Sequence, residues 1–205
     1  MIEIVLALLG GVVGVAAGAW LRQRRYQPSP THSLGWSSVL MAGAATAVTF
    51  GLLAWRADET ALLLGVAFVT GGVIAMWTDL DAHRLPDWLT LPLAVVLLGI
   101  LVVDAAVTGS WVGLATALLA TGAVALLLLV WAIFGSLGTG DVKLGLSVGL
   151  VLGYLGWPDV LRGLLFSALI SMAWAIVLLA MGRSKKSYLP MGPALILGVV
   201  SCLVW

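Results

Sequence analysis

The feature that most constrains this chain is a series of apolar runs, each near 20 residues long, that recurs along most of its length. As an α-helix, about 20 apolar residues cross the roughly 30 Å of hydrocarbon in a bilayer. The composition agrees, because only 9% of the 205 residues are charged, whereas a soluble domain is about one quarter charged. The sequence therefore predicts an all-α, polytopic membrane protein.

Eight spans are predicted, and together they form one integral membrane domain over residues 1–205. They cover about 2–21, 36–55, 61–78, 88–107, 111–134, 142–156, 160–181 and 189–205. The sixth is short: about 15 residues rising about 1.5 Å each barely reach across a bilayer, so this span could begin inside the protein. No basic segment precedes the first span and arginines follow it, which indicates an anchored helix rather than a signal peptide.

Tryptophan and the basic residues locate the span ends and their orientation. Nine of the ten tryptophans fall at or near predicted ends, where the indole ring prefers the headgroup level. With the N-terminus outside, eight Lys and Arg residues lie on the inner side and two, Arg56 and Arg162, on the outer side. This positive-inside bias predicts an N-out, C-out protein. Two stretches rich in aspartate, 79–87 and 138–141, then share the cytoplasmic side.

The first acidic stretch runs from Asp79 to Asp87. Asp79 follows the end of a predicted span, where the helix dipole disfavours a carboxylate, and a residue placed against its local preference is more often functional. Asp87 precedes the fourth span, where a carboxylate is favoured as an N-cap. Asp81 is expected to face water. His83 lies in the same loop and has no partner residues spaced as metal ligands.

The second acidic stretch is Gly138-Thr139-Gly140-Asp141-Val142-Lys143, between two apolar runs. Its glycines lack a Cβ and let another chain approach closely. Asp141 could cap the helix that follows or take part in catalysis, and its position alone leaves both readings open. Lys143 could pair with an acidic group of a substrate or with lipid phosphate.

Two carboxyl groups held about 3–5 Å apart do not both ionise easily, so they share a proton. The ionised group can take a proton from water while the protonated one donates to a scissile carbonyl, as in aspartic proteases. This chemistry needs no metal or other cofactor. The single cysteine, Cys202, lies in the last apolar run and provides neither a disulfide framework nor a zinc site. Neither a Ser–His–Asp set nor a basic stripe for nucleic acid is present.

Three motifs in order resemble the type IV prepilin leader peptidases. The segment from Asp79 through Arg84-Leu85-Pro86-Asp87 resembles the first, Gly138 to Leu144 the Gly-x-Gly-Asp-x-Lys-Leu motif, and Leu189-Pro190-Met191-Gly192-Pro193 the opening of the last span. The resemblance implies that Asp79 and Asp141 form the catalytic pair. It also implies substrate-positioning roles for Gly138, Gly140, Lys143, Arg84 and Pro86.

The same resemblance implies the reaction and its partners. The protein would remove the short basic leader of prepilin-like precursors (type IV pilins, pseudopilins or Flp-type proteins), cutting just before their hydrophobic helix. Large members of the family carry a cysteine-rich domain between the first two spans and also methylate the new N-terminus. Here residues 22–35 form a short loop without cysteine. A compact form that cleaves and does not methylate is therefore expected.

Other functions remain open at this point. In a proton-coupled transporter component, Asp79 and Asp141 would relay protons, although such sites tend toward the midplane of the membrane. A presenilin-type protease shares the Gly-x-Gly-Asp motif, but its first aspartate follows a tyrosine and Asp79 follows Thr78. A non-catalytic assembly scaffold is the last alternative.

Overall fold

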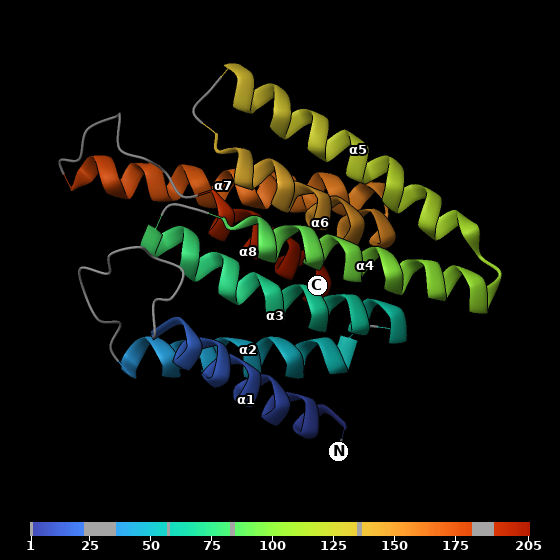
Figure 1. Ribbon diagram of the computed structural model, residues 1–205, viewed down its shortest axis with the longest axis horizontal. Coiled ribbons are helices and arrows are strands. Elements are labelled where there is room, and N and C mark those ends of the chain that lie inside the picture. Colours follow the sequence, from blue (N-terminus) through green and yellow to red (C-terminus); the bar gives the residue numbers. More distant parts are fainter. Residues whose placement is uncertain (1, 23–35, 57, 83–84, 135–136, 182–190) are drawn as a thin grey trace.

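The computed structural model describes residues 2–22, 36–56, 58–82, 85–134, 137–181 and 191–205, and these residues form helices and short connections without strands (Figure 1). In chain order the helices are α1 (Ile2–Arg22), α2 (Trp36–Arg56), α3 (Glu59–Ala82), α4 (Asp87–Thr108), α5 (Trp111–Phe134), α6 (Thr139–Leu155), α7 (Trp157–Ala180) and α8 (Gly192–Val204). The predicted all-α class is confirmed.

Among the described residues, five helices are long and apolar enough to cross a membrane, namely α1, α3, α4, α5 and α7. Shorter apolar segments, Val39–Trp55 and Gly192–Val204, lie in α2 and α8. Helix α6 has 17 residues and is buried along most of its length. A polytopic membrane protein is confirmed, while the number of eight spans stays a prediction.

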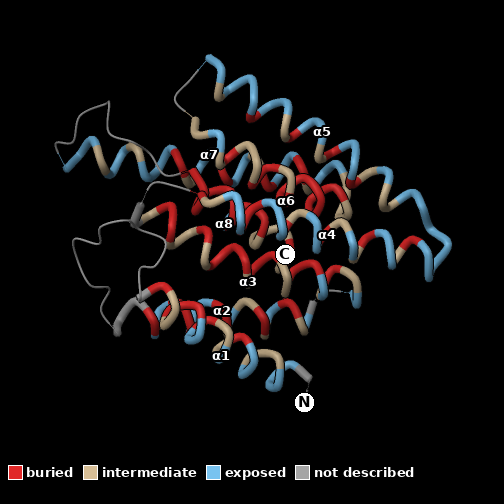
Figure 2. The backbone as a smooth tube through the Cα atoms, in the orientation of Figure 1, coloured by how far each residue is buried: buried red, intermediate tan, exposed pale blue. Residues whose placement is uncertain are grey.

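Three helices form the centre of the bundle. Helices α3, α6 and α8 contact one another, and the outer helices α1, α5 and α7 pack against them or against their neighbours. Figure 2 shows the difference in burial: α6 and α8 are mostly buried, whereas α5 and α7 expose long apolar faces. In a bilayer those exposed faces are the ones that contact lipid.

Helices α1 and α2 pack closely because small residues line their contact. A Cβ added at Gly14 would lie 2.6 Å from the carbonyl oxygen of Ala42. The hydroxyl of Thr46 donates to the carbonyl oxygen of Gly10 at 2.7 Å, which joins the two helices inside an apolar layer. The glycines of segment 10–18 therefore let α2 approach α1 closely. Packing of this kind drives helix association where lipid removes the hydrophobic driving force.

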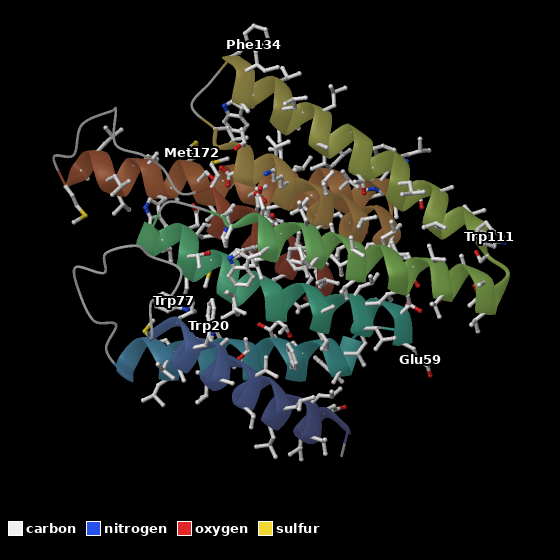
Figure 3. All side chains as sticks on the ribbon, viewed as in Figure 1. Trp20, Glu59, Trp77, Trp111, Phe134 and Met172 are labelled. Atoms are coloured by element: carbon white, nitrogen blue, oxygen red, sulfur yellow. The ribbon has the colours of Figure 1, made fainter. Side chains whose placement is uncertain are left out.

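The two acidic stretches lie at the same end of the bundle. The C-terminal end of α3 and the N-terminal ends of α4, α6 and α8 meet there (Figure 1). Trp20 and Trp77 lie toward this end, and Glu59 and Trp111 lie toward the opposite one (Figure 3). The arrangement agrees with the shared side expected from the sequence, and the membrane face to which it belongs stays a prediction.

Candidate active site

Asp79 lies inside α3, close to its C-terminal end. The predicted span ended at residue 78, but α3 continues to Ala82, so the carboxylate belongs to the helix itself. Asp79 is only 1% exposed. Its Oδ2 accepts a hydrogen bond from the backbone N–H of Gly192, at 3.0 Å. Because Gly192 is the first residue of α8, the positive end of that helix offsets the unfavourable dipole of α3.

Only a glycine fits at the start of α8 without displacing Asp79. A Cβ built on Gly192 would lie 2.8 Å from Oδ2 of Asp79, closer than real Cβ contacts. The next residue, Pro193, has no N–H, and the first helical positions are where an N–H has no helical partner in any case. The Met191-Gly192-Pro193 segment therefore provides one accessible donor and aims it at Asp79.

Asp141 lies in the first turn of α6 and is 2% exposed. Its Oδ2 accepts the backbone N–H of Gly138 at 3.2 Å. The carboxylate therefore caps the helix from within its first turn, while Gly138, which has no side chain, occupies the N-cap position itself. Its Oδ1 is buried and has no hydrogen-bond partner among the described residues. A buried oxygen in this state is costly and indicates that a water or ligand group belongs beside it.

The two carboxyl groups act on each other. Helices α3 and α6 are in contact, and the charge of Asp79 reaches Asp141. Burial disfavours the charged form of each group, and a neighbouring negative charge disfavours it further. Ionising both groups at once is therefore disfavoured.

Two other predicted site residues, Gly140 and Pro86, lie where the two acidic stretches approach each other. A Cβ on Gly140 would lie 2.8 Å from the Cβ of Leu85, so the glycine lets the α6 N-terminus lie directly against the segment before α4. Pro86 is the N-cap residue of α4, with an extended backbone. Arg84 and His83 lie outside the described residues, and so does the side chain of Asp81.

The prediction that Asp87 caps α4 is wrong. Pro86 occupies the N-cap position, and α4 has no side-chain cap hydrogen bond. Asp87 is instead the first helical residue, and its Oδ1 accepts a hydrogen bond from Lys143 Nζ at 2.6 Å. Lys143, for which the sequence leaves a substrate group or a lipid phosphate open as a partner, thus has a partner inside the protein.

One polar contact that the sequence analysis does not predict lies at the opposite end of the bundle. The hydroxyl of Thr60 in α3 donates to Oδ1 of Asp104 in α4 at 2.7 Å. An aspartate inside an apolar span is itself a signal, because a carboxylate there is costly without a partner. The contact joins α3 to α4 far along the bundle from Asp79. Within the described residues, no three His, Cys, Asp or Glu side chains gather as metal ligands would.

Comparison with known families decides the class of this site. The type IV leader peptidase family matches residues 66–180, more than half of the chain, including Asp79 and Asp141. The chain belongs to this family. Neither the curated proteins nor the solved structures gave a match. Membership in the family supports a peptidase, aspartic in general type, that processes prepilin-like leaders. The Met191-Gly192-Pro193 segment lies beyond the matched range, so its contact with Asp79 comes from the structure.

Substitution of Gly192 tests whether the close approach of α8 to Asp79 matters. In Gly192→Ala the added methyl group displaces the Asp79 carboxylate, and kcat/KM for leader cleavage should fall about 10- to 100-fold, because small misplacements of catalytic groups are expensive. Gly99→Ala is the matched control, since a Cβ at Gly99 meets nothing within 4 Å. Equal activity of the two purified variants would show that Asp79 does not depend on this contact.

Proposed function

We propose that the protein is a membrane aspartyl endopeptidase that removes the short basic leader from prepilin-like precursors, with Asp79 and Asp141 as its catalytic pair. The observation that carries this proposal is the buried Oδ1 of Asp141, which has no partner among the described residues and lies in an acidic site beside Asp79. A structural cap would need only the other oxygen of Asp141, which already accepts the N–H of Gly138.

The geometry favours a division of roles between the two groups. Each carboxyl accepts one backbone N–H at a helix N-terminus, Asp79 from Gly192 and Asp141 from Gly138, so these hydrogen bonds do not separate the roles. The distinguishing feature is Oδ1 of Asp141, which is buried without a partner among the described residues and is therefore the atom suited to carry a proton. Asp79 is therefore the base that takes a proton from water as the water oxygen attacks the scissile carbonyl carbon. Asp141 carries the shared proton on Oδ1 and donates it to the carbonyl oxygen. When the tetrahedral diol collapses, the C–N bond breaks, Asp79 gives the proton it took from water to the leaving amine, and Asp141 takes a proton back from a diol hydroxyl, which restores the pair.

The remaining site residues would position the substrate backbone. Gly138 and Gly140 keep side chains away from the turn that leads into Asp141, so an extended chain can approach it. Pro86, the N-cap residue of α4, lies at the same end of the bundle, and Arg84 precedes it by two positions in the sequence. Lys143 is not given a direct contact with the substrate, because its side chain already forms an ion pair with Asp87.

The charge bias supports a site at the cytoplasmic face of the membrane. With both termini outside, eight basic residues lie on the inner side and two on the outer side. Together with the family match, this bias supports the bacterial cytoplasmic membrane as the location of the protein. A substrate with a basic leader and a hydrophobic helix would keep its helix in the bilayer and present the cleavage site at this edge. A proton-relay role is less well supported, because both aspartates lie near one end of the bundle and relay sites tend toward the midplane.

Replacing either aspartate tests the pair. Asp79→Asn and Asp141→Asn keep the size of the side chain and abolish the shared ionisation, so each should remove essentially all cleavage of a prepilin-like peptide. The double variant should be hardly worse than either single one, because residues that act as a unit are strongly non-additive. Asp104→Asn, also in a predicted span but at the opposite end, is the control and should remain active. Full activity in either site variant contradicts the proposal.

The same two variants test the division of roles. An asparagine at position 141 keeps an N–H donor near the carbonyl, whereas an asparagine at position 79 leaves no base. Any residual cleavage, measured over long incubation, should therefore be greater in Asp141→Asn than in Asp79→Asn. The reverse order would exchange the two assignments.

The short loop between α1 and α2 leads us to propose that the enzyme does not methylate its product. Residues 22–35 contain no cysteine, so the cysteine-rich domain of the large family members has no counterpart there. Mass spectrometry of a processed substrate should show a free α-amine even when a methyl donor is supplied. An N-methylated product formed by the purified protein alone would contradict this.

A further inference from the structure

An ion pair joins the two acidic stretches at the surface of the site. Lys143 Nζ lies 2.6 Å from Asp87 Oδ1, and the side chains are 35% and 60% exposed. Lys143 follows Asp141 by two residues in α6, and Asp87 begins α4 directly after the connection from α3. The ion pair thus links the helix that carries Asp141 to the segment that follows Asp79 in the chain.

A second contact joins the same two segments. Gly140 packs against Leu85, which is 9% exposed, and a Cβ at Gly140 would lie 3.3 Å from the carbonyl oxygen of Leu85 as well as close to its side chain. One contact is apolar and buried, and the other is ionic and at the surface. We call these two contacts between residues 85–87 and 138–143 the clasp.

The stability of the protein does not account for the ion pair. Exposed pairs contribute little to folding, because water and salt screen them and two long side chains must be ordered. A cation near the N-terminal end of α6 also gains nothing from the helix dipole, which favours anions there. The pair is better explained by what it does to geometry: it fixes where α4 begins relative to α6, next to the buried carboxyls.

We infer that Asp87 and Lys143 are positioning residues, whose ion pair, together with the Leu85–Gly140 contact, sets the separation of Asp79 and Asp141. The inference rests on the proposed role of these two aspartates in cleavage. It reverses the expectation that Asp87 serves only as a helix cap. Neither residue touches the reacting atoms, so the loss of either should lower kcat and leave KM nearly unchanged.

Steady-state kinetics on a prepilin-like peptide test this. Asp87→Asn and Lys143→Met should each lower kcat about tenfold, since catalytic geometry is sensitive to small displacements. The double variant Asp87→Asn/Lys143→Met should be no worse than either single one, because the residues act through each other. The charge swap Asp87→Lys/Lys143→Asp should recover most of the lost kcat.

The chain offers a matched control for the loss of an exposed ion pair. Arg162 and Asp159 form a pair at 3.1 Å near the start of α7, away from the acidic stretches. Arg162→Met should leave kcat at the level of the unsubstituted protein. If Arg162→Met lowers kcat as much as Lys143→Met does, the effect is a general one on folding and the inference fails.

A distance measurement separates failure of the clasp from failure of the proposed function. Spin labels at Thr139→Cys and Leu91→Cys, both exposed positions, in a Cys202→Ser background report the approach of α6 to α4. The clasp predicts a short, narrow distance distribution that broadens in Asp87→Asn and narrows again in the charge swap. An unchanged distribution, or a broadened one with unchanged kcat, overturns the inference. If the unsubstituted protein does not cleave, the proposed function fails, and the distance distribution alone decides whether the ion pair holds the segments together.

Discussion

The hydrogen bond from the start of α8 to the buried carboxylate of Asp79 is the interaction on which the site depends. Asp79 sits near the C-terminal end of α3, where the helix dipole opposes a negative charge, and it is almost fully removed from solvent. Without a compensating donor, a carboxylate in this place would be expensive to ionise. The N–H of Gly192, at the positive end of a second helix, provides that donor. Asp141 differs: a backbone N–H at the N-terminus of its own helix binds one oxygen, and the other oxygen has no partner in the part of the chain that the structure describes.

This requirement explains why α3, α6 and α8 form the centre of the bundle. One helix brings the first carboxylate, one brings the second, and one brings the donor, so all three must meet at the same end. Their close approach depends on positions without a side chain, at Gly140 against Leu85 and at Gly192 against Asp79. The outer helices α5 and α7 can then present apolar side chains outward. Their exposed faces contact lipid in a bilayer. Helix α6 is buried along most of its length, which fixes the position of Asp141 within the bundle.

The helices and the two buried aspartates could be predicted from the sequence. The contacts that could not be predicted share one cause. Apolar length predicts the helices well, because crossing a membrane is a constraint on single segments. Asp79 and Asp141 stand out because charge between apolar runs is costly. The donor to Asp79 lies 113 residues away, and the partner of Lys143 lies 56 residues away, so no local pattern contains either contact. Asp87 shows the same limit. Its position in the sequence favours a helix cap, and only the fold shows that Lys143 lies beside it.

The central claim is that Asp79 and Asp141 share one proton during cleavage, and the pH dependence of kcat/KM tests it most directly. The measurement uses the purified protein in a bilayer mimic and a prepilin-like peptide whose only ionisable groups near the cleavage site are the Lys and Arg residues of its leader, which stay charged up to about pH 10. A shared proton predicts a bell-shaped profile, because the rate requires one carboxyl charged and one protonated, and both limbs belong to the pair. A profile with one limb only, or a rate that does not fall on both sides of its optimum, would contradict the claim.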